Sequence, residues 1–75
     1  MPKLPRLSGA EIIRILQRVV FFEARQRCSH VVMKKITPEG AVGCVVPMHK
    51  EVATGTLYSI LKQAHLTPEE FEAHR

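Results

Sequence analysis

The amino-acid sequence predicts a small α+β fold: one helix, three antiparallel strands, a second helix and a short third helix, with the helices on one face of the sheet. Three observations support this. Apolar residues recur at helical spacing after residue 9, β-branched residues dominate the middle of the chain, and a second helical pattern follows residue 54. With 75 residues, we expect a single domain over residues 1–75 and no deep pocket. Residues 1–7 contain two prolines and are expected to be extended.

A Ser-x-x-Glu capping box, formed by Ser8 and Glu11, predicts the start of the first helix. Apolar residues then repeat with the period of an amphipathic helix. We expect this helix to run from Gly9 to Arg18 or Val19.

Three strands are expected at residues 21–27, 29–36 and 41–46, where β-branched and other apolar residues are frequent. The segment Thr37-Pro38-Glu39-Gly40 is a turn signal between the second and third strands. Pro47 cannot donate a ladder hydrogen bond and is expected to end the third strand.

The turn also predicts a register for the second and third strands. Pairing Ile36 with Ala41 places His30 opposite Pro47 in the antiparallel ladder. His49 then falls just beyond the ladder, so we expect both histidines at the same end of the sheet.

Two further helices are expected after the strands. Thr54 is predicted to cap a helix whose first residues are Gly55 and Thr56 and whose apolar positions continue to Ala64. Residues 67–70 form a second capping box with proline at the first helical position, which predicts a short terminal helix.

The formal net charge of +4 is distributed unevenly along the chain. Residues 1–35 hold eight of the eleven lysines and arginines but only two of the seven carboxylates. This asymmetry favours a polyanion as partner. Two cysteines make no disulfide framework, and no apolar run is long enough to span a membrane. We therefore expect a cytoplasmic protein with free thiols, no membrane association and no cofactor.

One histidine stands out because cations surround it in a strand-like segment. Arg25 and Arg27 precede His30, and Lys34 follows it. An imidazole has a reference pKa of about 6.5 and can therefore accept or donate a proton near neutral pH. Beside cations that attract phosphates, such a group suggests RNA chemistry.

Four segments, in order along the chain, carry a family resemblance: Leu4-Pro5-Arg6-Leu7-Ser8-Gly9 before the first helix, Arg25-Gln26-Arg27 leading to Ser29-His30, Val46-Pro47-Met48-His49, and residues 54–64 followed by Leu66 and residues 67–71. Through these segments the chain resembles the HicA family of bacterial toxins over nearly its whole length.

This resemblance implies a fold like that of the double-stranded-RNA-binding domain. It also implies a metal-independent endoribonuclease that cleaves messenger RNA and is neutralised by a HicB-type antitoxin. A homo-oligomer is expected only within the antitoxin complex. The family's Gly-Ser-His motif aligns with Cys28-Ser29-His30, which makes His30 the expected catalytic residue.

The sequence departs from the family pattern at three positions where the family has glycine. Cys28 stands beside the expected catalytic histidine, and Val20 and His65 follow the two main helices, at positions where helix ends favour glycine. These departures leave open an alternative, a non-catalytic RNA-binding module or a lapsed toxin retained for antitoxin binding.

Metal-free RNA cleavage needs a proton acceptor, a proton donor and cations near the reacting phosphate. His30 is the first candidate for proton transfer, and His49 is the second. A cysteine nucleophile at Cys28 and a zinc site at Cys28, His30, Cys44 and His49 are disfavoured, because no orienting acid and no Cys-x-x-Cys spacing is present. Phe21 and Phe22 are expected in the core, with Tyr58 exposed. The candidates for RNA contact are Arg25, Arg27, Ser29, Lys34, Lys50 and Thr56.

Overall fold

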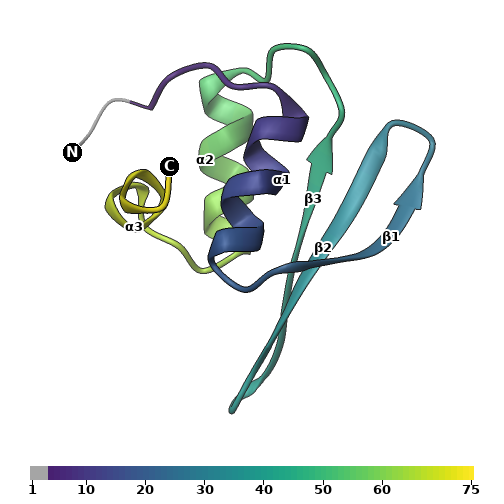
Figure 1. Cartoon of the computed structure of the whole chain (residues 1–75), viewed down its shortest axis with the longest axis vertical. Helices are drawn as coiled ribbons and strands as arrows, with labels where there is room; N and C mark the ends of the chain where they lie inside the picture. The colour runs from purple at the N-terminus through teal and green to yellow at the C-terminus, as the bar shows by residue number, and fades with distance from the viewer. Residues whose placement is uncertain (1–3) are drawn as a thin grey trace.

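Six helices and strands follow one another in the computed structural model, which describes residues 4–75 (Figure 1). Their order confirms the predicted α+β fold with a short third helix. The elements are α1 (Gly9–Arg18), β1 (Phe22–Arg27), β2 (His30–Thr37), β3 (Gly40–Pro47), α2 (Thr54–Gln63) and α3 (Pro68–Ala73).

The segment before α1 was expected to be extended over residues 1–7. Residues 1–3 lie outside the described part of the chain, and residues 4–7 form no helix. Leu7 instead makes an isolated antiparallel bridge with Val52, whose N–H donates to the Leu7 carbonyl at 2.7 Å. This bridge joins the segment before α1 to the segment before α2.

The three strands form one antiparallel sheet in the order β1-β2-β3. The predicted register is confirmed, because Ile36 pairs with Ala41 and His30 pairs with Pro47. The expected start of the second strand at Ser29 was wrong by one residue: Ser29 belongs to the two-residue turn between β1 and β2. The third strand is one residue longer at each end than predicted.

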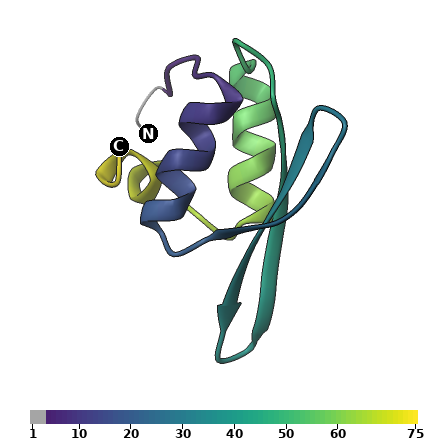
Figure 2. The ribbon, with the colours of Figure 1, turned by 45° about the vertical axis from the view of Figure 1, so that its right-hand side comes forward.

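The helices cover one face of the sheet, as predicted, and the β2–β3 hairpin projects beyond them (Figures 1 and 2). Every second residue of β2 and β3 faces this layer, including the fully buried Val31, Met33 and Val46. They pack with apolar residues of the helices such as Ile12, Leu16, Leu57, Leu61 and Phe71, which are also fully buried. Within residues 4–75, the other face of the sheet is free of helices, and we call it the outer face.

The start of α1 lies against the end of β3. Gly9 N–H donates to the carbonyl of His49 at 2.9 Å, and a Cβ atom at Gly9 would clash with the carbonyl oxygen of Pro47. Glycine is thus required by close backbone approach. The capping box of Ser8 and Glu11 is present as predicted.

The predicted cap of α2 was wrong. Thr54 lies inside the helix, and the N-cap is Ala53, whose side chain forms no capping hydrogen bond. The bridge between Leu7 and Val52 fixes the chain immediately before Ala53, so the helix begins one residue earlier than the Thr-Gly-Thr pattern suggests. The second predicted capping box, of Thr67 and Glu70, is present at the start of α3.

Candidate functional site

The outer face of the sheet brings together the cations that the sequence singled out. In the ladder between β1 and β2, Arg27 pairs with His30 and Arg25 pairs with Val32. Since paired residues project to the same side of a sheet, Arg25, Arg27, His30 and Lys34 share this face. All four side chains are exposed.

A β-bulge in β1 changes which side chains reach the outer face. The register shifts between Glu23 and Arg25, so Ala24 is an extra residue without its own partner. Phe22 pairs with Lys34 and lies on the same side as Arg25, although they are three positions apart in the chain.

The expectation that Phe22 belongs to the core was therefore wrong. Its side chain is 46% exposed, whereas the side chain of Phe21 is only 4% exposed. An exposed aromatic ring among cations is a platform on which a nucleobase can stack. Sequence reasoning missed this residue because a bulge leaves no clear local signal in one strand.

The outer face carries no carboxylate at any strand position that the register assigns to it. The ion pairs found within residues 4–75 use other cations, Arg6 with Glu51 and Arg75 with Glu72. The guanidinium groups of Arg25 and Arg27 and the ammonium group of Lys34 are therefore available to an external anion. A phosphate backbone supplies such anions at regular intervals.

His30 is the first residue of β2 and follows the turn Cys28-Ser29. Cys28 has a φ of 55°, and Ser29 has no positive φ. This is the sign pattern of a type II′ turn, whose first central position favours glycine. The backbone thus adopts at Cys28 the conformation that a glycine would adopt without strain.

The segment that carries His49 is tied to this turn by its backbone. The N–H of Met48 donates to the carbonyl of Ser29 at 2.7 Å, and the carbonyl of His49 accepts from Gly9 at 2.9 Å. His49 and its neighbour Lys50 are exposed, at the same end of the sheet as His30. After Pro47 the chain leaves the ladder and turns towards α1, so His49 is not part of the outer face.

Thr56 lies in the first turn of α2, in the helix layer. The first hydrogen bond at the start of the helix runs from Leu57 N–H to the carbonyl of Ala53 at 3.0 Å. The N–H groups of Thr54, Gly55 and Thr56 therefore precede the helical ladder and can serve an anion or water. This helix end starts near the His49 segment but does not share a face with Arg25 and Lys34.

The side chains of Cys28, His30, Cys44 and His49, which the sequence disfavours as a zinc site, cannot converge on one ion. Cys44 is buried between the sheet and the helices, whereas His30 projects from the opposite face. Burial raises the pKa of the Cys44 thiol to about 11, which keeps it protonated. Within residues 4–75, no group of three His, Cys, Asp or Glu side chains is placed to hold a metal ion.

A family model described as HicA toxin of bacterial toxin-antitoxin systems matches residues 9–66. The chain belongs to the HicA toxin family. The matched range starts with α1, ends just after α2 and includes His30, His49 and every candidate for RNA contact. No curated protein matches the chain.

Family membership makes this chain the toxin of a toxin–antitoxin system and implies an antitoxin as partner. This HicA toxin places its candidate cations on an open face rather than in a pocket. Within residues 4–75, no helix is both long and apolar enough to cross a bilayer.

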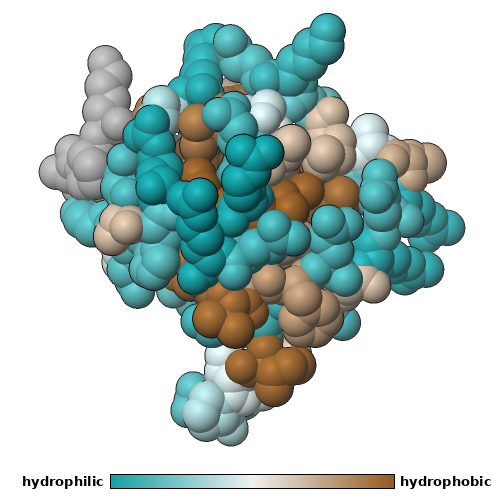
Figure 3. Space-filling view, in the orientation of Figure 1, coloured by the Kyte–Doolittle hydropathy of each residue, from teal (hydrophilic) through white to brown (hydrophobic). Residues whose placement is uncertain are grey.

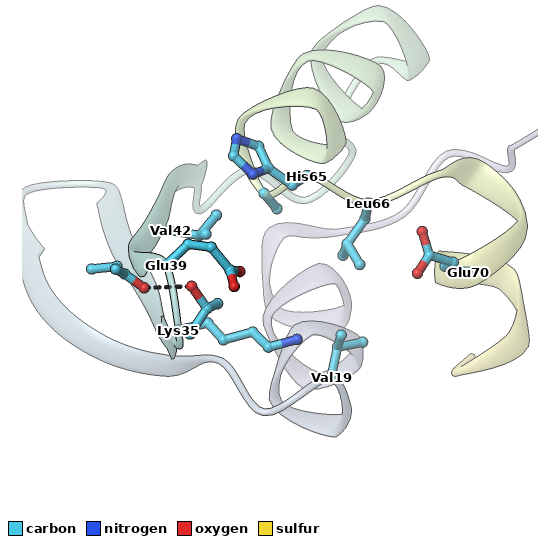
Figure 4. Close-up of a pocket in the computed structure, with 11 residues that line it drawn as sticks. Val19, Lys35, Glu39, Val42, His65, Leu66 and Glu70 are labelled. Atoms are coloured by element: carbon cyan, nitrogen blue, oxygen red, sulfur yellow. Dashed lines mark hydrogen bonds between the residues drawn. The ribbon is translucent and has the colours of Figure 1, made fainter.

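A hollow of about 510 Å³ lies elsewhere in this HicA toxin, beside the projecting hairpin and the C-terminal end of α2 (Figure 4). Neither His30 nor His49 lines it, and none of the candidates for RNA contact does so. It lies on the helix side of the sheet, whereas the candidate cations project from the outer face.

Proposed function

We propose that this HicA toxin is an endoribonuclease that cleaves messenger RNA without a metal ion. The observation that supports this most strongly is the position of His30, exposed at one end of a cationic sheet face that lacks carboxylates. An imidazole there meets phosphates held by its neighbours, and its ring nitrogens can donate or accept a proton in general acid–base catalysis.

The proposed reaction is attack by the ribose 2′-oxygen on the adjacent phosphorus. A base takes the 2′-hydroxyl proton, the bond from phosphorus to the 5′-oxygen breaks, and an acid protonates that leaving oxygen. The products are a 2′,3′-cyclic phosphate and a 5′-hydroxyl end. His30 performs one of the two proton transfers, and His49 is the second candidate because its segment is hydrogen-bonded to the turn before His30.

The outer face supplies the RNA-binding groups. Arg25, Arg27 and Lys34 contact phosphates and stabilise the charge that develops during attack. Phe22, opposite Lys34, stacks on a base. Ser29, Lys50 and Thr56 add contacts around the His30 end of the molecule.

A single-stranded RNA fits this arrangement better than a duplex, because Phe22 can stack only on an unpaired base. We further propose that residues 1–75 act as one domain and that a HicB-type antitoxin neutralises the activity. A messenger RNA substrate places the activity in the cytoplasm.

Incubation of the full chain with a long single-stranded RNA in EDTA tests the proposal. We expect fragments that end in 2′,3′-cyclic phosphate and 5′-hydroxyl groups. An intact RNA that is nevertheless retained, with an affinity that falls as salt increases, would contradict cleavage and favour a non-catalytic RNA-binding protein.

A further inference from the structure

Strand β3 leaves part of its edge without a hydrogen-bonded neighbour. The N–H of Val45 donates to Oε1 of Gln63 in α2 at 3.3 Å, so it points away from β2. Residues two apart along a strand point the same way, and the register between β2 and β3 has no shift. Ala41 and Gly43 therefore also direct their N–H and C=O groups away from β2.

No element of residues 4–75 covers this lower part of the edge. α2 reaches β3 at Val45, and the hairpin then projects beyond the helices (Figures 1 and 2). Within residues 4–75, neither Ala41 nor Gly43 forms a backbone hydrogen bond outside the strand ladder. An edge of this kind is a template on which another strand can form.

The hollow of about 510 Å³ lies directly beside this edge, and we call it the hairpin groove. Figure 4 shows Val42 of β3 on one side of the groove and Leu66, after α2, on the other. Lys35 extends along the groove towards Val19. The apolar residues that line the groove are Val19, Ala41, Val42, Ala64 and Leu66.

A strand added to β3 would place alternate side chains on the two faces of the sheet. Those on the helix side would enter the hairpin groove, where the apolar residues stand beside the polar side chains of Lys35, Thr37, Glu39, His65 and Glu70. Figure 3 shows exposed apolar surface on the projecting hairpin. Ile36, whose side chain is 71% exposed, pairs with Ala41 and projects from the outer face.

The side chains on the outer face would meet a cation. Lys34 pairs with Gly43, and its stem lies against this glycine: a Cβ atom at Gly43 would be 3.7 Å from Cγ of Lys34. Lys34 is thus the cation directly across from the open edge of β3 at Gly43. No strand position of the outer face carries a carboxylate that could neutralise it. An acidic side chain on the added strand is its electrostatic complement.

We propose that the edge of β3 from Ala41 to Gly43 is the docking site of the antitoxin, which adds a strand of alternating apolar and acidic residues. The apolar residues fill the hairpin groove, and an acidic residue pairs with Lys34. The partner follows from family membership. The inference rests on the proposed ribonuclease function in one respect only: an antitoxin residue paired with Lys34 would make this cation unavailable for RNA binding.

Amide hydrogen exchange in the complex of the full chain with the antitoxin of the same toxin–antitoxin pair tests this docking mode. We expect the exchange of the Ala41 and Gly43 amides to slow by at least about tenfold on complex formation. Exchange at unchanged rates in the saturated complex would overturn the proposal. Slowing in the isolated chain as its concentration rises would also overturn it, because a second copy would then occupy the edge.

The substitution Ala41→Pro provides a second test, because it removes the outward N–H without touching the ladder with β2. We expect it to weaken antitoxin binding by about tenfold or more. Gln26→Pro is the matched control at the opposite edge of the sheet. Gln26 pairs with Val31, and the backbone N–H and C=O groups of Val31 point towards β3. The N–H of Gln26 therefore points away from β2, at the free edge of β1. A greater loss of affinity with Gln26→Pro than with Ala41→Pro would overturn the assignment to β3.

RNA cleavage and antitoxin binding are measured separately. If the antitoxin does not slow amide exchange at Ala41 and Gly43, the docking mode is contradicted whether or not the free chain cleaves RNA. Absence of cleavage by the free chain contradicts the proposed function and leaves the exchange measurement unaffected.

Discussion

Val20 and His65 occupy equivalent positions at the ends of the two main helices, with φ angles of 71° and 57°. Each follows the C-cap residue of its helix, and in each case the next residue closes the helix end. Phe21 N–H donates to the carbonyl of Leu16 at 3.0 Å, and Leu66 N–H donates to that of Leu61 at 2.9 Å. Both ends are Schellman motifs, which favour glycine at the residue with positive φ.

We predict that Val20→Gly and His65→Gly each stabilise the protein. A left-handed conformation costs a residue with a Cβ atom about 1 kcal/mol, and more when the side chain is β-branched, so Val20→Gly should give the larger increase. The free energy of unfolding in urea measures the effect. Ala64→Gly is the matched control, because Ala64 has a φ of −83° and its replacement should destabilise. Destabilisation by Val20→Gly would contradict the strain argument.

We predict that Arg27→Gln weakens RNA binding and lowers its salt dependence. Loss of one phosphate contact should reduce the slope of log affinity against log salt by about 0.7 for a single strand. Titration of a single-stranded RNA at several salt concentrations measures this slope; both chains also carry His30→Ala, which we expect to prevent cleavage during the titration. Lys62→Gln, on exposed α2 surface away from the outer face, should leave it unchanged. Equal slopes for both variants would show that the outer face does not hold the RNA.

We predict that only one of the two cysteines reacts with a thiol reagent in the folded protein. Cys28 is exposed, whereas burial raises the pKa of the Cys44 thiol to about 11. At pH 8 roughly one Cys44 in a thousand would be ionised, and the thiolate is the reactive form. Titration should find one thiol in buffer and two in urea. Rapid reaction of the folded Cys28→Ser variant would contradict this assignment.

The two capping boxes predict how stability depends on pH. Hydrogen bonds with Ser8 and Thr67 hold the pKa values of Glu11 and Glu70 below their ordinary value of 4.5. A carboxyl group with a lowered pKa in the folded state stabilises above its unfolded pKa and loses this contribution as pH falls through the folded value. The double variant Glu11→Gln/Glu70→Gln should therefore lose less stability than the native chain between neutral pH and the acid range. Thermal unfolding across this range measures the difference, and equal losses would contradict the prediction.

Local signals in the sequence predicted the parts of the fold that depend on neighbouring residues. The capping boxes at Ser8 and Thr67 and the turn after Thr37 are short patterns, and the turn also sets the register that places His30 opposite Pro47. The start of α2 was predicted incorrectly, because the bridge from Leu7 to Val52 joins segments far apart in the chain.

The outer face was only partly predictable for a similar reason. Alternation along each strand correctly grouped Arg25 with Arg27 and His30 with Lys34, but the relation between the two groups depends on pairing. The bulge at Ala24 exists only in the paired strands, and it is what brings Phe22 to this face.

The central claim is that His30 transfers a proton during RNA cleavage on the outer face. The most direct measurement compares single-turnover cleavage of one RNA in EDTA by the native chain and by His30→Ala, with RNA affinity measured alongside. We expect the rate to fall by at least about 100-fold while the affinity changes by less than about threefold. Equal cleavage by both proteins would contradict the claim and transfer the role to another residue.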